Sequence, residues 1–191
     1  GFSRKAHFLV LMDFIARSSS ACDNSLVDVP CDDISIQANP ELGDIGALVS
    51  LHGALFCEAY GLNASFEADV AASLGSFATR RTGREILWIV KRGERVMGSL
   101  GVARHNDREA EIRWFVLDPE LRCQGLGSKL LEDAIVFARN QNYRSIHVWT
   151  AVRFKEAEQL YRHHGFRLTE QYVNRKWGTS VTEQRYDLFL S

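Results

Sequence analysis

Residues 117–134, "LDPELRCQGLGSKLLEDA", constrain the fold of this chain more than any other stretch. They join the end of an apolar strand to a helical pattern through an Asp-Pro turn and two glycines, Gly125 and Gly127. The first N–H groups of a helix have no partner within it and attract anions, above all phosphates. Glycines ahead of the helix allow an anion to approach the backbone closely. The segment therefore predicts a phosphate-binding loop or, in the simpler case, a strand-to-helix turn.

The composition indicates one globular domain with no preference for large anionic partners. A chain of 191 residues with 46% hydrophobic content can fill a sizeable core. Lys and Arg number 23 against 24 Asp and Glu, which gives a formal charge of −1. Because the charges balance, no field over the whole chain would attract nucleic acid or an anionic membrane, and we expect neither partner. Any anion that the protein binds would have to be bound by local groups.

The cysteines and the N-terminal segment favour a cytoplasmic protein without a metal. Cysteines 22, 31, 57 and 123 lie far apart and show no zinc-like spacing, so we expect reduced thiols. Residues 1–30 have no clear period and are interpreted as an appended segment, with the domain proper over 31–191. Their apolar run is interrupted by Asp13, which argues against a secretory signal.

Periodicity predicts an alternating order of elements in the rest of the chain. A strand over 32–38 precedes two helices, over 41–61 and over 63–81, and the second of these is capped by Asn63 or Ser65. Residues 85–119 predict three antiparallel strands joined by tight turns. A helix after Gly127, a buried strand, a short helix and two closing strands complete a mixed α+β sheet.

Two motifs together identify a family, whereas the common nucleotide motifs are excluded. A P-loop needs lysine where Ser128 stands, and a dinucleotide fingerprint needs glycine where Leu130 stands. The pattern Arg-x-x-Gly-x-Gly over 122–127, followed by Leu-Tyr-x-x-x-Gly-Phe over 160–166, resembles the GNAT superfamily of acyl-CoA-dependent N-acyltransferases. The resemblance covers about residues 32–190. More narrowly, residues 42–61 and 178–190 are similar to the acetyltransferase half of MarR-GNAT fusion proteins.

The resemblance implies a fold and a site for acetyl-CoA. The fold would be a mixed, mostly antiparallel seven-stranded sheet with helices on both faces and a strand splay at the acyl-CoA site. Backbone amides of 123–128 would hold the pyrophosphate, and the strand before them would pair its main chain with the pantetheine arm. The implied cofactor-binding residues are Phe115, Val116, Leu117, Arg122, Cys123, Gln124, Gly125, Leu126, Gly127, Ser128 and Lys129.

The resemblance also implies an acid and a base for amine acylation. Tyr161 matches the tyrosine that faces the thiolate, although a core tyrosine bonded to a carbonyl is the structural alternative. Glu111 stands where several members carry a catalytic glutamate, although it would equally suit a solvated strand position. His52 is a candidate for the substrate site, and the alternative is a satisfied core histidine.

These residues predict an acetyl-CoA-dependent N-acetyltransferase in which a primary amine attacks the thioester directly in a ternary complex. The acceptor would be a small-molecule or peptide amine, and a homodimer through the C-terminal strands is a further expectation from the family. The alternative is a CoA-binding regulatory or interaction module with weak turnover. It is motivated by Ala151 and Val152, which stand where relatives often carry an asparagine near the pantetheine.

Overall fold

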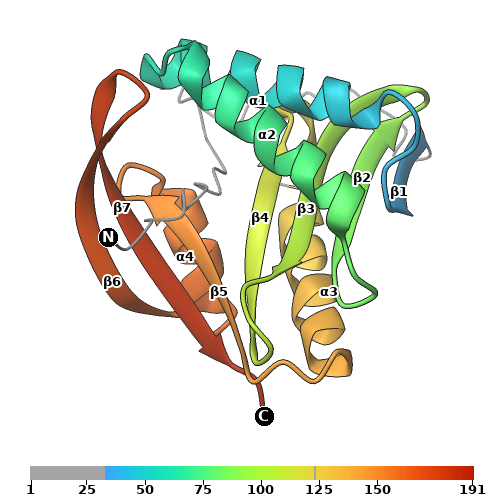
Figure 1. The fold of residues 1–191 in the computed structure, drawn as a ribbon, viewed down its shortest axis with the longest axis vertical. Coiled ribbons are helices and arrows are strands. Elements are labelled where there is room, and N and C mark those ends of the chain that lie inside the picture. Colours follow the sequence, from blue (N-terminus) through green and yellow to red (C-terminus); the bar gives the residue numbers. More distant parts are fainter. Residues whose placement is uncertain (1–32, 123) are drawn as a thin grey trace, which may run out of the picture.

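The computed structural model describes residues 33–122 and 124–191, so the appended segment and Cys123 lie outside the described residues. Within this part of the chain, the order of helices and strands is the predicted one (Figure 1). The elements are β1 (Ile34–Ala38), α1 (Asp44–Tyr60), α2 (Ala64–Arg80), β2 (Ile86–Arg92), β3 (Arg95–Arg104), β4 (Glu109–Leu117), the 3-10 helix η2 (Pro119–Leu121), α3 (Leu126–Asn140), β5 (Ser145–Ala151), α4 (Lys155–His163), β6 (Arg167–Lys176) and β7 (Thr179–Phe189).

One seven-stranded sheet forms the centre of the molecule, in the order β1-β2-β3-β4-β5-β7-β6. All neighbouring strands pair antiparallel except β4 and β5, which pair parallel and are connected through α3. The predicted mixed, mostly antiparallel sheet is therefore confirmed.

Helices cover both faces of the central strands, which explains why these strands are apolar on both sides. All residues of β3 except its two ends are buried. Phe77 of α2 packs against Trp114 of β4, whereas Phe137 of α3 packs against Trp88 of β2. In Figure 1, α2 passes in front of β3 and β4, and α3 lies behind them. Helices on both faces were expected, and the structure confirms them.

The first two helices begin by different devices. The side chain of Asn63 accepts a hydrogen bond from the Ser65 amide, which confirms Asn63 as the cap of α2. Helix α1 begins at Asp44 after Gly43, which has a φ of 94°, three residues later than the predicted start at residue 41. None of the described helices is long and apolar enough to cross a membrane.

The parallel pair β4–β5 separates halfway along its length. Residues 109–112 of β4 pair with 145–148 of β5, and the pairing stops there. Strand β5 continues to pair with β7 as far as Ala151, while residues 113–117 of β4 pair, within residues 33–122 and 124–191, with β3 alone. This separation is the predicted strand splay, and no described strand covers the edge of β4 that it exposes.

Candidate active site

A bulge in β4 begins where the two strands separate. Between the pairs Ser99↔Val116 and Gly101↔Arg113 the register shifts, so that β4 carries one residue more than β3. Trp114 lies in this bulge with a φ of 50°, an uncommon conformation for a non-glycine residue. The Ser99 hydroxyl donates to the Trp114 carbonyl, and the Trp114 indole donates to the Ser73 hydroxyl at 2.9 Å. The bulge is therefore held from β3 and from α2.

Gly101 allows the Trp114 ring to approach β3 closely. A Cβ at position 101 would come within 2.6 Å of that ring. This clash could be removed only by a shift of the buried Trp114 indole, so a side chain at position 101 would disturb the bulge.

The N-terminus of α3, at Leu126, follows the end of β4 at Leu117 after the short helix η2. Gly125 precedes the helix with a φ of 75°, and no side chain of the described residues caps the first turn of α3. The first turn also contains no acidic residue. Its N–H groups therefore remain available to an anion, as the glycine pattern predicted.

The side chains around this loop have partners within the protein. The Arg122 guanidinium donates to the Leu117 carbonyl through Nε at 3.2 Å and Nη2 at 3.1 Å. Lys129 Nζ lies 3.1 Å from Asp133, and Gln124 donates to the Glu120 carbonyl. Ser128 Oγ lies 2.8 Å from His164 Nε2, which links the start of α3 to the end of α4. An anion at this loop would therefore meet backbone amides more than free side-chain charge.

Tyr161 points inward from α4, as predicted. Its side chain is fully buried, beside the rings of Phe166 and Tyr186. The hydroxyl has no hydrogen-bond partner among the described residues. Burial raises the pKa of Tyr161 well above its ordinary value, so that the hydroxyl keeps its proton. The structure thus places a protonated phenol inside the core without the carbonyl partner of the structural alternative.

Glu111 lies on β4 just before the splay and is mostly buried. It is paired with Ala103 of β3 and with His147 of β5. A solvated strand position is therefore not what the structure shows. Its role as a base stays a prediction.

His52 lies on the inner side of α1 with only 3% of its surface exposed. Its Nδ1 lies 2.8 Å from the Leu48 carbonyl one turn earlier, and its ring packs beside Phe56. Burial lowers the pKa of His52 to about 4. These contacts are those of a core histidine, and contact with a substrate stays a prediction.

A cavity of about 470 Å³ lies between α2 and the bulge. Its walls include Asp69, Ser73 and Phe77 of α2 and Arg113 and Trp114 of β4. Arg113 is the first residue of β4 beyond the last pair with β5, so the cavity reaches the splay from the side of α2. It is a candidate acceptor pocket.

Several residues of this site were not singled out from the sequence. Ser99 and Arg113 lie in apolar strands. The one signal in the sequence that could have found them is that each is a polar residue at a position expected to be buried. His147 was missed in the same way, because it lies in the apolar strand segment "RSIHVWT", and it is completely buried. Pairing between strands, which periodicity does not supply, brings His147 beside Glu111.

Comparison with known proteins gives the class of protein. The model of the acetyltransferase (GNAT) family matches residues 55–166. An N-acetyltransferase of Methanocaldococcus jannaschii is 34% identical over 68 residues, which cover 36% of this chain and 29% of that protein. Human N-acetyltransferase 8 is 31% identical over 99 residues, 49% of this chain and 44% of that protein. The matched stretches thus span less than half of either relative.

Solved structures share the fold. An acetyltransferase from Salmonella typhimurium, solved with its cofactor acetyl-CoA, has a TM-score of 0.66 at 20% identity, covering 84% of this chain and 95% of that one. A ribosomal-protein-alanine N-acetyltransferase from Brucella melitensis has a TM-score of 0.67 at 16% identity, covering 82% and 99%. The chain belongs to the GNAT family of acetyltransferases, and the predictions of its fold and family are confirmed.

Proposed function

We propose that this protein transfers an acetyl group from acetyl-CoA to a primary amine. The observation that carries the proposal is the open edge of β4, which is followed, after η2, by the uncapped N-terminus of α3. An amide-rich ligand that ends in phosphates fits this pair of features, because a free strand edge binds amides and a helix N-terminus binds phosphate. A structural relative solved with acetyl-CoA supports the same assignment.

In this proposal, the main chain of Phe115, Val116 and Leu117 pairs with the pantetheine arm, and the amides of residues 123–128 surround the pyrophosphate. An N–H of the open strand would also polarise the thioester carbonyl. Arg122 acts indirectly, because its guanidinium holds the Leu117 carbonyl at the turn between the two parts of the site.

The reaction needs one proton acceptor and one proton donor. The amine nitrogen forms a bond to the acyl carbon in a ternary complex, and the carbon–sulfur bond breaks. Glu111 takes the proton that the amine loses, directly or through water. Tyr161 gives a proton to the departing thiolate, a role supported by its buried, protonated and unbonded hydroxyl.

The acceptor is a small-molecule or peptide amine that enters from the cavity between α2 and β4. The narrower kinship with the acetyltransferase half of MarR-GNAT fusion proteins is part of this proposal. It is supported by the similarity of residues 42–61 and 178–190 noted above.

Two measurements test the proposal in sequence. Acetyl-CoA at ~100 times its Kd should add ~2.7 kcal/mol to the free energy of unfolding. Release of free CoA thiol across a panel of amines, amino acids and peptides should then identify at least one acceptor. No stabilisation would contradict the proposal, and stabilisation without thiol release from any amine would favour the CoA-binding module.

A further inference from the structure

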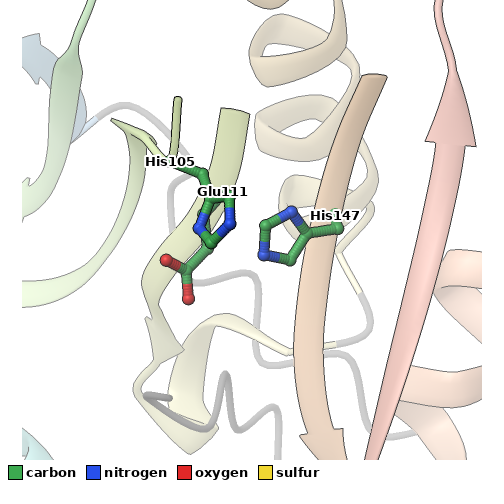
Figure 2. Close-up of side chains that lie close together, drawn as sticks. All are labelled: His105, Glu111 and His147. Atoms are coloured by element: carbon green, nitrogen blue, oxygen red, sulfur yellow. The ribbon is translucent and has the colours of Figure 1, made fainter. Parts of the chain in front are cut away.

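A cluster of two imidazoles and a carboxylate lies next to the site (Figure 2). His105 lies in the turn between β3 and β4, Glu111 on β4 and His147 on β5. One potential ligand atom from each residue lies within 4.8 Å of those of the other two. Figure 2 shows the His147 ring directed toward His105 and Glu111. Residues that are distant in sequence therefore lie close together, and their nitrogen and oxygen atoms are the ligand types of a transition-metal site.

His147 is an independent indication that something binds in this cluster. Its side chain is completely buried, and neither ring nitrogen makes a hydrogen bond within the described part of the chain. Nδ1 lies 3.2 Å from Glu109 Oε1, so this nitrogen faces a carboxylate. For Nε2, the residues that the structure describes offer no hydrogen-bond partner. A buried imidazole nitrogen without a hydrogen bond destabilises the folded protein unless a ligand binds to that nitrogen.

The surroundings of His147 match the outer shell of a metal site. Histidines that bind metals commonly direct their other ring nitrogen at a carboxylate, which fixes the tautomer and leaves the ligating nitrogen unprotonated. Glu109 supplies that carboxylate. Arg185 holds Glu109 by an ion pair and is itself paired with Asp187 at 2.6 Å, so the carboxylate is fixed in place.

We propose that His105, Glu111 and His147 bind a divalent transition-metal cation of the Zn²⁺ type. Two imidazoles and one carboxylate make a three-ligand zinc set with further positions left for water. His105 is about one-third exposed, which gives the cation a route from solvent. Hard cations such as Mg²⁺ prefer oxygen ligands and fit this donor set poorly.

The site has a consequence for catalysis that rests on the proposed function. A cation bound to Glu111 withdraws charge from this carboxylate and lowers its basicity, so that it accepts the proton of the amine less readily. Zinc at this cluster therefore slows acetyl transfer, and loss of His105 relieves the inhibition. The binding of zinc itself does not depend on the proposed function.

The test is calorimetric titration of the chelator-treated full chain with ZnCl₂, with MgCl₂ as the control titration. We expect one saturable zinc site and no magnesium site. His105→Gln and Glu111→Gln should each weaken zinc binding by ~100-fold or more. Glu109→Gln should weaken it by ~10–100-fold, because it removes only the outer carboxylate. CoCl₂ should give visible d–d absorption bands that the same variants remove.

His163→Gln is the matched control, because His163 is an exposed residue of α4 that belongs to neither group of potential metal ligands and should not affect zinc binding. His105→Gln changes a partly exposed side chain, and thermal unfolding without metal will show that it folds. Zinc binding that His105→Gln and Glu109→Gln leave unchanged would come from other groups, such as His7 or Cys22, and would overturn the proposal. So would the absence of any saturable zinc site.

Discussion

The Tyr161 hydroxyl is buried without a hydrogen-bond partner among the described residues, although burial of an unpaired hydroxyl costs ~1–3 kcal/mol. Tyr161→Phe removes the oxygen and keeps the ring. We therefore expect the free energy of unfolding to stay equal or rise slightly, whereas kcat falls by ~10²–10⁴, nearer the lower end because a thiolate leaves readily.

The measurement for Tyr161→Phe is kcat under conditions in which chemistry limits the rate, together with the Kd of acetyl-CoA. The Kd should change little. An unaltered kcat would remove Tyr161 from the mechanism and leave catalysis to positioning and to the strand amides.

His52 makes the stability of the fold sensitive to acid. Burial lowers its pKa from 6.5 to about 4. Since the unfolded chain binds the proton first, stability is lost as the pH falls from about 6.5 toward 4. At pH 5 this loss amounts to ~2 kcal/mol. His52→Gln should lose less stability than wild type between pH 7 and pH 5, as measured by urea unfolding.

Other acid-sensitive groups are common to both proteins, so the difference between them isolates His52. One such group is Glu109, whose pKa is lowered to about 2 by contact with His147 and Arg185. Equal losses in the two proteins would contradict this account of His52. A large rise in the KM of the amine in His52→Gln would instead support contact with the substrate.

At the residue scale, the sequence was sufficient to predict those site residues that lie within short motifs. The Gly125 turn and the inward Tyr161 were predicted because local spacing defines both. The neighbours of Glu111 were not predicted, because His147 reaches it only through parallel pairing across a crossover.

At the scale of elements, the bulge in β4 is held against its backbone preference. A non-glycine residue in the left-handed region costs ~1–2 kcal/mol, which Trp114 recovers through Ser99 and Ser73. Ser99→Ala leaves the Trp114 carbonyl without its hydroxyl partner. We expect a loss of ~1–3 kcal/mol in the free energy of unfolding and a higher KM for acetyl-CoA.

Urea unfolding and steady-state kinetics check this expectation. A variant as stable as wild type, with the same KM, would show that the bulge does not depend on Ser99.

The order of elements was predictable because each lies in a contiguous pattern of alternating or helical spacing. The splay was expected only from the resemblance to a family, since the strand sequences do not show where β4 leaves β5. The bulge was not predicted at all, because register between β3 and β4 depends on tertiary packing of Trp114.

At the scale of the whole molecule, β6 is the last strand of the sheet, and none of the described strands pairs with its outer edge. Val173 on this strand is 65% exposed, and Phe189 at the end of β7 is 79% exposed. We expect a homodimer through the C-terminal strands. Light scattering should show a dimer for wild type and a shift toward monomer for Val173→Lys, and a monomer at all concentrations would contradict the expectation.

The central claim is that the loop before α3 binds the phosphates of acetyl-CoA. Calorimetric titration with acetyl-CoA tests it most directly, on wild type, on Gly127→Val and on Gly46→Val. Both glycines lie in the first turn of a helix, but Gly127 is buried beside the proposed phosphate site, whereas an added Cβ at Gly46 meets nothing within 4 Å. We expect one site in wild type, a loss of affinity of more than ~10-fold (~1.4 kcal/mol) in Gly127→Val with the fold retained by circular dichroism, and wild-type affinity in Gly46→Val. Unchanged affinity in Gly127→Val, or no binding by wild type, would show that the glycines only shape a turn.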